Sequence, residues 1–330
     1  MTTRLRSAST LPAVRPITLA LEGGGSLGAF TWGVLDRLLE VADLRIAVVS
    51  GTSAGAMNGA MLVQGLATGG PPAAKQLLET FWRRVAIAAG SLPGPLNAWL
   101  NAVTGAIAPV VDIARHAGAA LSPGVSRTGI NPMRGILTEL LDPAAFSRPG
   151  VPELVVAATR VRTGAVRLFR GAEVGVDALL ASACLPQLFP PVEIGGEAYW
   201  DGGYASNPPV RPLIEAGAPS DVLIVRTTPL ERLSTPTGAM AVQERVNEIT
   251  FGSALRGELR TLALAQALLA AVSDLPTPLA RLRDARLHMI GAEAEFQAMH
   301  GGSRQDPTWT FLSEMHGLGV AAAERWLADN

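Results

Sequence analysis

The chain has 330 residues, of which 48% are hydrophobic and 17% are charged, and 27 basic residues nearly balance 28 acidic ones. This length allows one large α/β domain or two small ones. The balanced charge argues against nucleic acid as a partner. The single cysteine excludes an internal disulfide.

The N-terminal stretch and the apolar segments bear on where the protein resides. Residues 1–15 carry early arginines but no uninterrupted apolar run, so we interpret them as a disordered lead-in and not as a signal peptide. No segment reaches the roughly 18 consecutive apolar residues that a membrane-crossing helix needs. These features favour a cytoplasmic location with peripheral membrane contact at most.

Predicted strands and helices alternate from residue 17 onward. Residues 17–21 form a short apolar run that ends in glycines, which predicts a buried parallel strand. Apolar residues at helical spacing follow Gly28. The next strand is expected at residues 46–49, and a helix of small residues continues to about Gln64. This alternation predicts a parallel sheet.

The later segments extend the same pattern. Further strands are expected at residues 154–158, 166–169, 222–225 and 286–290, and helices at 176–184, 211–216, 240–272 and 318–328. Residues 66–128 hold glycine and proline clusters around apolar helical pieces, and they fit either helices packed on the sheet or a cap over an apolar pocket. We expect a single α/β domain over residues 16–330, with a helical, cap-like insertion at 66–128 and a C-terminal helical region at 226–330.

Residues 19–30, LALEGGGSLGAF, satisfy two glycine patterns at once. The six residues from Gly23 match the G-x-G-x-x-G of a dinucleotide-binding turn. The five residues from Gly24 match a G-x-S-x-G elbow, with Ser26 as nucleophile. A dinucleotide site also requires an acidic residue about 20 positions further on, at the end of the second strand. That strand ends in Ser-Gly-Thr-Ser, which disfavours the dinucleotide interpretation.

A second elbow pattern is Gly51-Thr52-Ser53-Ala54-Gly55. The two glycines give the serine room for a strained turn between strand and helix, and the helix N-terminus points free N–H groups at the serine oxygen. An ordinary helix N-cap is the alternative role of this serine. We predict that Ser53 is the nucleophile and that the N–H groups of Gly24, Gly25 and Ala54 stabilise the oxyanion.

A serine nucleophile needs a base, and Ser26 remains the weaker candidate nucleophile. The chain has four histidines, of which His300, beside two glycines, is the least implausible base. The stronger candidate is Asp201, where an apolar strand gives way to Gly202 and Gly203. An ordinary Asp-Gly turn is the alternative interpretation.

Taken together, these motifs resemble those of the patatin-like phospholipases. The matching residues, in the order of that family, are Gly23-Gly24-Gly25 with Gly28, the elbow from Gly51 to Gly55 around Ser53, and Asp201-Gly202-Gly203. Residues 181–191 also resemble the stretch that leads to the aspartate. The resemblance, which runs from about residue 17 to 225, implies a three-layer α/β/α fold with a central, mostly parallel sheet and helical insertions.

The resemblance also implies a catalytic dyad, in which Ser53 attacks acyl esters of lipids and Asp201 is the base. It places Gly24 and Gly25, together with Gly23, in the oxyanion hole. We expect no cofactor and no metal. A non-catalytic acyl-chain or lipid-binding protein that retains the fold is the alternative.

Two residues in or next to the glycine loop, Leu27 and Glu22, differ from the residues that other members of this family carry. Leu27 stands where many members carry a basic residue, so neutral esters and thioesters stay open as substrates beside phospholipids. Glu22 stands where some relatives have Asp. For Asp201, partial burial beside aromatic neighbours would raise its pKa and make it a better base.

Overall fold

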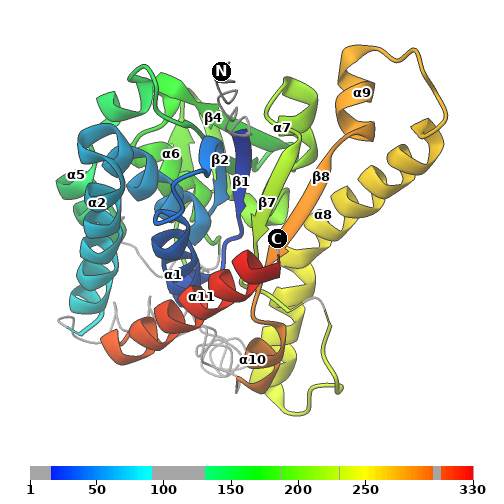
Figure 1. Ribbon diagram of the computed structural model, residues 1–330. Coiled ribbons are helices and arrows are strands. Elements are labelled where there is room, and N and C mark those ends of the chain that lie inside the picture. Colours follow the sequence, from blue (N-terminus) through cyan, green and yellow to red (C-terminus); the bar gives the residue numbers. More distant parts are fainter. Residues whose placement is uncertain (1–15, 91–130, 187, 230, 300–305, 330) are drawn as a thin grey trace, which may run out of the picture.

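The computed structural model describes residues 16–90, 131–186, 188–229, 231–299 and 306–329. The expected lead-in at 1–15 and residues 91–128 of the expected insertion lie outside the described residues. The described part of the chain forms a central sheet with helices on both sides (Figure 1). Its strands are β1 (Pro16–Leu21), β2 (Arg45–Thr52), β3 (Glu153–Arg160), β4 (Val166–Arg170), β5 (Val192–Ile194), β6 (Glu197–Asp201), β7 (Asp221–Val225) and β8 (Arg286–Ile290).

Helices occupy most of the remaining described chain. The α-helices are α1 (Gly28–Leu38), α2 (Ala54–Gly90), α5 (Pro132–Leu140), α6 (Val176–Ser182), α7 (Arg211–Ala216), α8 (Ala239–Leu269), α9 (Thr277–Arg283), α10 (Glu293–Ala298) and α11 (Trp309–Asp329). Short 3-10 helices are η1 (Gly25–Leu27), η2 (Pro143–Ser147), η3 (Gly171–Glu173) and η4 (Gly202–Tyr204).

The strand order in the sheet is β5-β6-β3-β2-β1-β7-β8, and β4 pairs with β3. The five strands from β3 to β8 in this order pair in parallel. The other three strands are antiparallel: β4 and β6 to β3, and β5 to β6. The predicted mostly parallel sheet is confirmed, and the apolar strand expected before Asp201 is β6, whereas β5 is a strand that the sequence pattern did not predict.

The sheet is buried on both faces. Leu19 and Leu21 of β1 pack into a core with α1, α2 and α11, whereas Ala20 between them packs with α7, α8 and α9 on the other face. Strand β7 alternates in the same way, because Val222 and Ile224 join the second core. Successive side chains of a strand point to opposite faces, so an all-apolar strand requires a helical layer on each side. The expected three-layer α/β/α architecture is confirmed.

Several element boundaries differ from the prediction. Strand β2 continues to Thr52, since its last residues still pair with β1 and β3. Helix α2 consists of two helices joined at Gly69 and Gly70, whose backbone is not helical. Helix α11 begins at Trp309, nine residues before the predicted start at 318, because its first turns bury apolar side chains in the core around α1.

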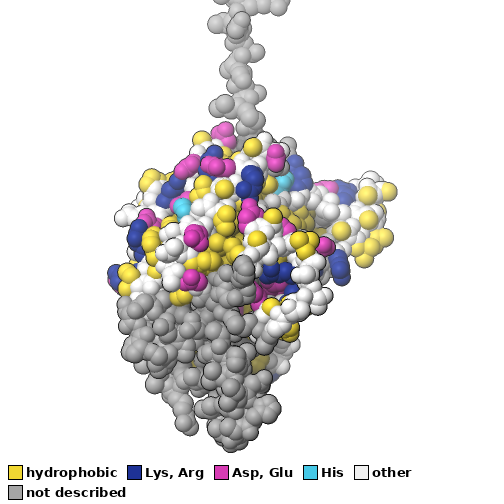
Figure 2. Space-filling view, turned by 90° about the horizontal axis from the view of Figure 1, so that it is seen from below, with side chains coloured by type: hydrophobic (Ala, Val, Ile, Leu, Met, Phe, Trp, Pro, Cys, Tyr) yellow, Lys and Arg dark blue, Asp and Glu magenta, His cyan; other side chains and the backbone are white. Residues whose placement is uncertain are grey.

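Helix α8 is a long helix with one buried side. Its Leu255 and Leu262 are buried in the second core, but Leu264 and Leu268 are 61% and 69% exposed. Figure 1 shows that α8 and α9 project from the body, and Figure 2 shows hydrophobic side chains on this projection. The middle of α8 lies against the residues that follow β6, through Phe251 and Glu258.

Candidate active site

Ser53 lies at the carboxyl end of β2, one residue before α2 begins. Its φ angle is +53°, and it is the only non-glycine residue with positive φ among the described residues. The glycines beside it allow this turn. A Cβ on Gly51 would lie 2.5 Å from the backbone of Gly55, and a Cβ on Gly55 would lie 2.1 Å from the carbonyl oxygen of Leu21. The elbow geometry expected around Ser53 is therefore present.

The backbone N–H of Ser53 donates to the hydroxyl of Ser182 at 2.9 Å. Ser182 is fully buried at the end of α6. This contact gives the N–H of the strained residue a partner, which a buried donor requires. No local pattern could predict this contact of Ser182, since the two residues are 129 positions apart.

Strand pairing brings Asp201 close to Ser53. Thr52 of β2 is paired with Ala157 of β3, and the next residue of β3, Ala158, is paired with Asp201 of β6. One strand therefore separates the end of β2 from the aspartate. The Ser53 hydroxyl lies close enough to the Asp201 carboxyl group to lower its pKa.

The carboxylate of Asp201 is almost completely removed from water, with 1% of the residue exposed. Burial raises the pKa of Asp201 to about 7, and hydrogen bonds from the Gly203 N–H and from Ser53 partly oppose this rise. The Gly203 N–H lies 2.7 Å from Asp201 Oδ1. At neutral pH the carboxyl group thus exchanges protons easily, which suits a general base.

Both glycines after Asp201 are needed for packing. A Cβ on Gly202 would lie 2.3 Å from the carbonyl oxygen of Ala157, and a Cβ on Gly203 would lie 2.0 Å from the ring of Phe251 on α8. Side chains at either position would push the aspartate away from β3 or from α8. The Asp-Gly-Gly motif is therefore a close-packed joint between the sheet and α8.

The glycine loop follows β1, the neighbour of β2 in the sheet. Gly23 is buried, and its N–H donates to Asn207 Oδ1 at 2.7 Å. Its carbonyl oxygen accepts from the Thr227 hydroxyl at 3.0 Å. Gly24 and Gly25 are half-buried, and Gly25 has a φ of +60° at the start of η1.

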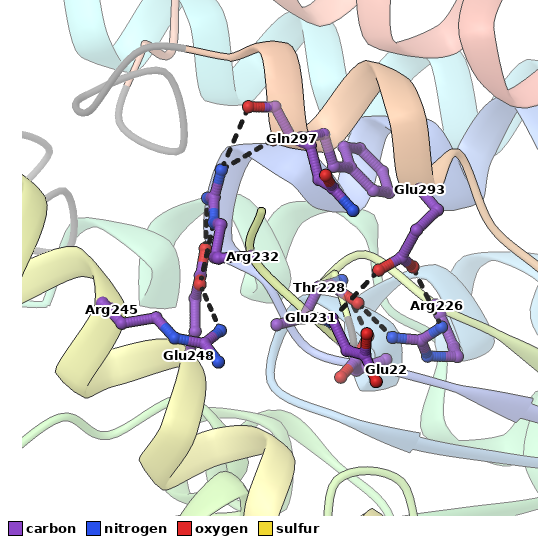
Figure 3. Close-up of polar contacts among 10 residues, drawn as sticks. Glu22, Arg226, Thr228, Glu231, Arg232, Arg245, Glu248, Glu293 and Gln297 are labelled. Atoms are coloured by element: carbon purple, nitrogen blue, oxygen red, sulfur yellow. Dashed lines mark hydrogen bonds and ion pairs between the residues drawn. The ribbon is translucent and has the colours of Figure 1, made fainter. Parts of the chain in front are cut away.

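A buried carboxylate supports this loop. Glu22 is 1% exposed, and its Oε2 accepts from the N–H groups of Thr227 and Thr228 at 2.7 and 3.0 Å. Arg226 donates to the Thr228 carbonyl oxygen and lies 3.4 Å from Glu293 (Figure 3). Glu22 thus connects the end of β1 to the end of β7, a role for which the sequence showed no signal.

Ser26 and Leu27 are both turned inward. Ser26 is 7% exposed and Leu27 is 1% exposed, and Leu27 packs in the core with α1 and α2. The side chain of Leu27 is therefore part of the hydrophobic core and does not face the site. No polar contact joins Ser26 to an acid or a histidine among the described residues.

The described histidines lie elsewhere. His316 is paired with Asp36 at 2.8 Å, and His288 lies 3.7 Å from Asp221. His116 and His300, the latter a candidate base, lie outside the described residues.

Helix α8 holds the chain that follows the aspartate. The Glu258 carboxylate accepts from the Ser206 hydroxyl and from the N–H groups of Val210 and Arg211, at 2.9, 2.9 and 2.8 Å. Asn207, whose side chain binds Gly23, lies inside this segment. Glu258 was also missed, because its partners are about fifty positions away and no motif marks them.

Two kinds of feature are absent from the described residues, a membrane-spanning helix and a metal site. No helix there is both long and apolar enough to cross a bilayer. Nor does this part of the chain bring together three or more His, Cys, Asp or Glu side chains in a way that could hold a metal ion.

Comparison with known proteins places these features in a family. A family model described as patatin-like phospholipase matches residues 19–214. Among solved structures, the chain is similar to VipD from Legionella pneumophila, with 17% sequence identity and a TM-score of 0.42. This match covers 96% of the present chain and 67% of the other. No curated protein matches the sequence.

Proposed function

The chain belongs to the patatin-like phospholipase family, and from this premise we propose that it is a serine acyl hydrolase that cleaves lipid or other acyl esters. Ser53 is the nucleophile and Asp201 the base. The observation that carries the proposal is that the strained Ser53 lies beside a buried carboxyl group, one strand away in the sheet, whose pKa is raised to about 7. A nucleophile within hydrogen-bond reach of a base is the arrangement that covalent catalysis requires.

The first half of the reaction forms an acyl-enzyme. The Ser53 oxygen attacks the ester carbonyl carbon while its proton passes to the Asp201 carboxylate. The carbonyl oxygen becomes an oxyanion, which the N–H groups of Gly24, Gly25 and Ala54 stabilise at the start of the two helices. Collapse of this intermediate breaks the bond to the alcohol, which leaves with the proton from Asp201.

The second half of the reaction regenerates the enzyme. Water attacks the acyl-enzyme and gives a proton to Asp201, the same oxyanion site stabilises the second intermediate, and Ser53 leaves with that proton. Gly23 differs from the other loop residues, because its N–H is already bonded to Asn207. We therefore assign Gly23 to fixing the loop, and Gly24, Gly25 and Ala54 to contacting the oxyanion.

Leu27 bears on the substrate, because it lies in the core and offers no charge to a phosphate group. The proposed substrates therefore include neutral acyl esters and thioesters as well as phospholipids. A cytoplasmic location with peripheral membrane contact remains part of the same proposal.

The test is hydrolysis of p-nitrophenyl esters of varied chain length by the wild type and by Ser53→Ala, Asp201→Asn and Ser26→Ala. Ser53→Ala should lower kcat by about 10³-fold or more, as removal of a catalytic serine does elsewhere. Ser26→Ala is the matched control, because Ser26 also fits a G-x-S-x-G pattern.

The outcomes separate the alternatives. Full activity in Ser53→Ala contradicts the proposal, and selective loss in Ser26→Ala moves the nucleophile to the glycine loop. A folded wild type that binds fatty acids but hydrolyses none of the esters supports the non-catalytic lipid-binding alternative.

A further inference from the structure

Thr227 is a fully buried residue just beyond the end of β7, next to the start of the glycine loop. Its hydroxyl donates to the Gly23 carbonyl oxygen at 3.0 Å, and its N–H donates to Glu22 at 2.7 Å. It therefore contacts two successive residues at the end of β1. Thr227 also lies outside the matched residues 19–214 of the family model.

The peptide bond between Gly23 and Gly24 explains why this contact matters. A trans peptide is planar, and its C=O and N–H groups point in opposite directions. Fixing the direction of the Gly23 carbonyl therefore fixes the direction of the Gly24 N–H. A donor on the carbonyl also polarises the peptide, which strengthens the N–H on the other side as a donor.

The surroundings of Thr227 keep the contact rigid. The Gly23 N–H is held by Asn207 at 2.7 Å, so Gly23 is bonded on both sides. A Cβ on Gly24 would lie 2.4 Å from the Thr227 hydroxyl oxygen, so the loop and the threonine touch directly. Glu22 fixes the backbone of Thr227 and Thr228, and Figure 3 shows Glu22 beside Thr228.

We propose that Thr227 is a positioning residue, whose hydroxyl holds the Gly23–Gly24 peptide so that the Gly24 N–H points at the oxyanion. This inference rests on the proposed function. Thr227 does not touch the reacting atoms. It acts through the glycine loop, and its effect appears in kcat because the charge on the oxygen develops on the way to the tetrahedral intermediate and is absent from the bound ester.

The test is steady-state kinetics of the full chain with a p-nitrophenyl ester, comparing Thr227→Val, Thr227→Ser and Thr18→Val. Valine has nearly the shape of threonine without the hydroxyl, and serine keeps the hydroxyl. Thr18→Val is the matched control, since Thr18 is also fully buried and its hydroxyl donates to a carbonyl oxygen at 3.0 Å, that of Pro219. Thr18 lies on β1, three residues before Leu21, the last residue of the strand before the glycine loop.

Loss of an oxyanion donor itself lowers kcat by about 10²–10³-fold, so a misdirected donor should cost somewhat less. We expect Thr227→Val to lower kcat about 10- to 100-fold with KM changed less than about threefold. Thr227→Ser should restore kcat to within about threefold of the wild type, and Thr18→Val should leave kcat within about twofold. A purely structural role would lower the melting temperatures of both valine variants alike and leave their kcat values equal.

The outcomes are distinct for the two proposals. Equal kcat in Thr227→Val and Thr18→Val, in an enzyme whose activity depends on Ser53, overturns the role of Thr227 alone. Wild-type activity that survives Ser53→Ala overturns the proposed function and this inference with it. If Thr227→Val does not fold, Thr227→Ala removes the same hydroxyl without a new methyl group. The role of Thr227 is then overturned if Thr227→Ala and Thr227→Ser have equal kcat values.

Discussion

At the scale of single residues, two opposing effects act on the pKa of Asp201. It is buried and yet bound on one oxygen by the Gly203 N–H, and burial prevails, so its pKa is raised to about 7. A raised carboxyl pKa brings the base close to neutral pH, where it both accepts and releases protons. The proposed dyad therefore predicts that activity depends on pH near neutrality.

We expect kcat/KM to rise with pH through a midpoint near 7 and to level off above it, because Asp201 accepts the Ser53 proton only as the carboxylate. An aspartate with the ordinary pKa of about 4 would give a midpoint about three units lower. The measurement is a pH–rate profile between pH 4 and 9. A profile that is flat above pH 5 contradicts the role of Asp201.

The stability of the protein reports the same pKa independently of activity. The folded state binds the Asp201 proton more tightly than the unfolded chain, so this group's contribution to stability is full below about pH 4 and is lost as pH rises through 7. In the wild type, this loss should lower the free energy of unfolding by on the order of 4 kcal/mol across this pH range. Asp201→Asn should abolish this dependence on pH. Urea unfolding at pH 4.5 and 8 checks this, and parallel curves for the two proteins would contradict it.

The residues of the site differ in how far the sequence revealed them. Ser53 and Asp201 stand in local motifs with glycines, which the sequence displays directly. Ser182 and Thr227 have no such motif, since their contacts with Ser53 and Gly23 span 129 and 204 positions. Contacts of this kind depend on the completed sheet, and a local pattern does not encode them.

At the scale of elements, the site is a meeting of strand ends and helix starts. The ends of β1, β2 and β7 lie side by side in the sheet, and the helices after β1 and β2 start at the glycine loop and at Ser53. A Cβ on Gly28 at the start of α1 would lie 2.7 Å from the Cβ of Ala54 at the start of α2. The two helix N-termini are therefore close enough to serve one anion.

Glycine substitutions at this junction should differ sharply from those on exposed helices. We expect Gly55→Ala to lower the free energy of unfolding by about 2–4 kcal/mol, because the new Cβ would lie 2.1 Å from the Leu21 carbonyl oxygen. Gly257→Ala in α8, whose new Cβ meets nothing within 4 Å, should raise it by about 0.5–1 kcal/mol. Urea unfolding of both variants is the measurement, and equal effects would show that the elbow has spare room.

Prediction of elements succeeded where a physical pattern was strong. The buried strands β1, β3 and β7 are short apolar runs with clear boundaries, and all were predicted. Strand β5 has only three residues, none of them fully buried, so it shows no such run. The short helices α9 and α10 were not predicted either, because each has only one buried side chain and so shows no periodic apolar pattern.

At the scale of the whole molecule, the site depends on the C-terminal third of the chain. The family model ends at residue 214, but Thr227, Phe251 and Glu258 all contact the catalytic loops. Helix α11 also crosses α1 closely, because a Cβ on Gly319 would lie 2.0 Å from the Phe30 carbonyl oxygen. The sequence showed no motif here, since these residues support the site without forming it.

A chain that ends at residue 225 should therefore not fold into an active enzyme. It would lack α8 and α9, which cover one face of the sheet, and α11, which covers α1. We expect no cooperative unfolding transition and no esterase activity from this fragment, as measured by circular dichroism and ester hydrolysis. A cooperatively folded fragment with Ser53-dependent activity would show that the family-matched part alone is sufficient.

The most direct test of the account is covalent labelling of the full chain with a fluorophosphonate, followed by mass spectrometry of the peptides. We predict one label per chain, on Ser53, with no label in Ser53→Ala and slower labelling in Asp201→Asn, because the probe reacts only with an activated serine. A label on Ser26, or an unlabelled and correctly folded wild type, would contradict the assignment of Ser53 as the nucleophile.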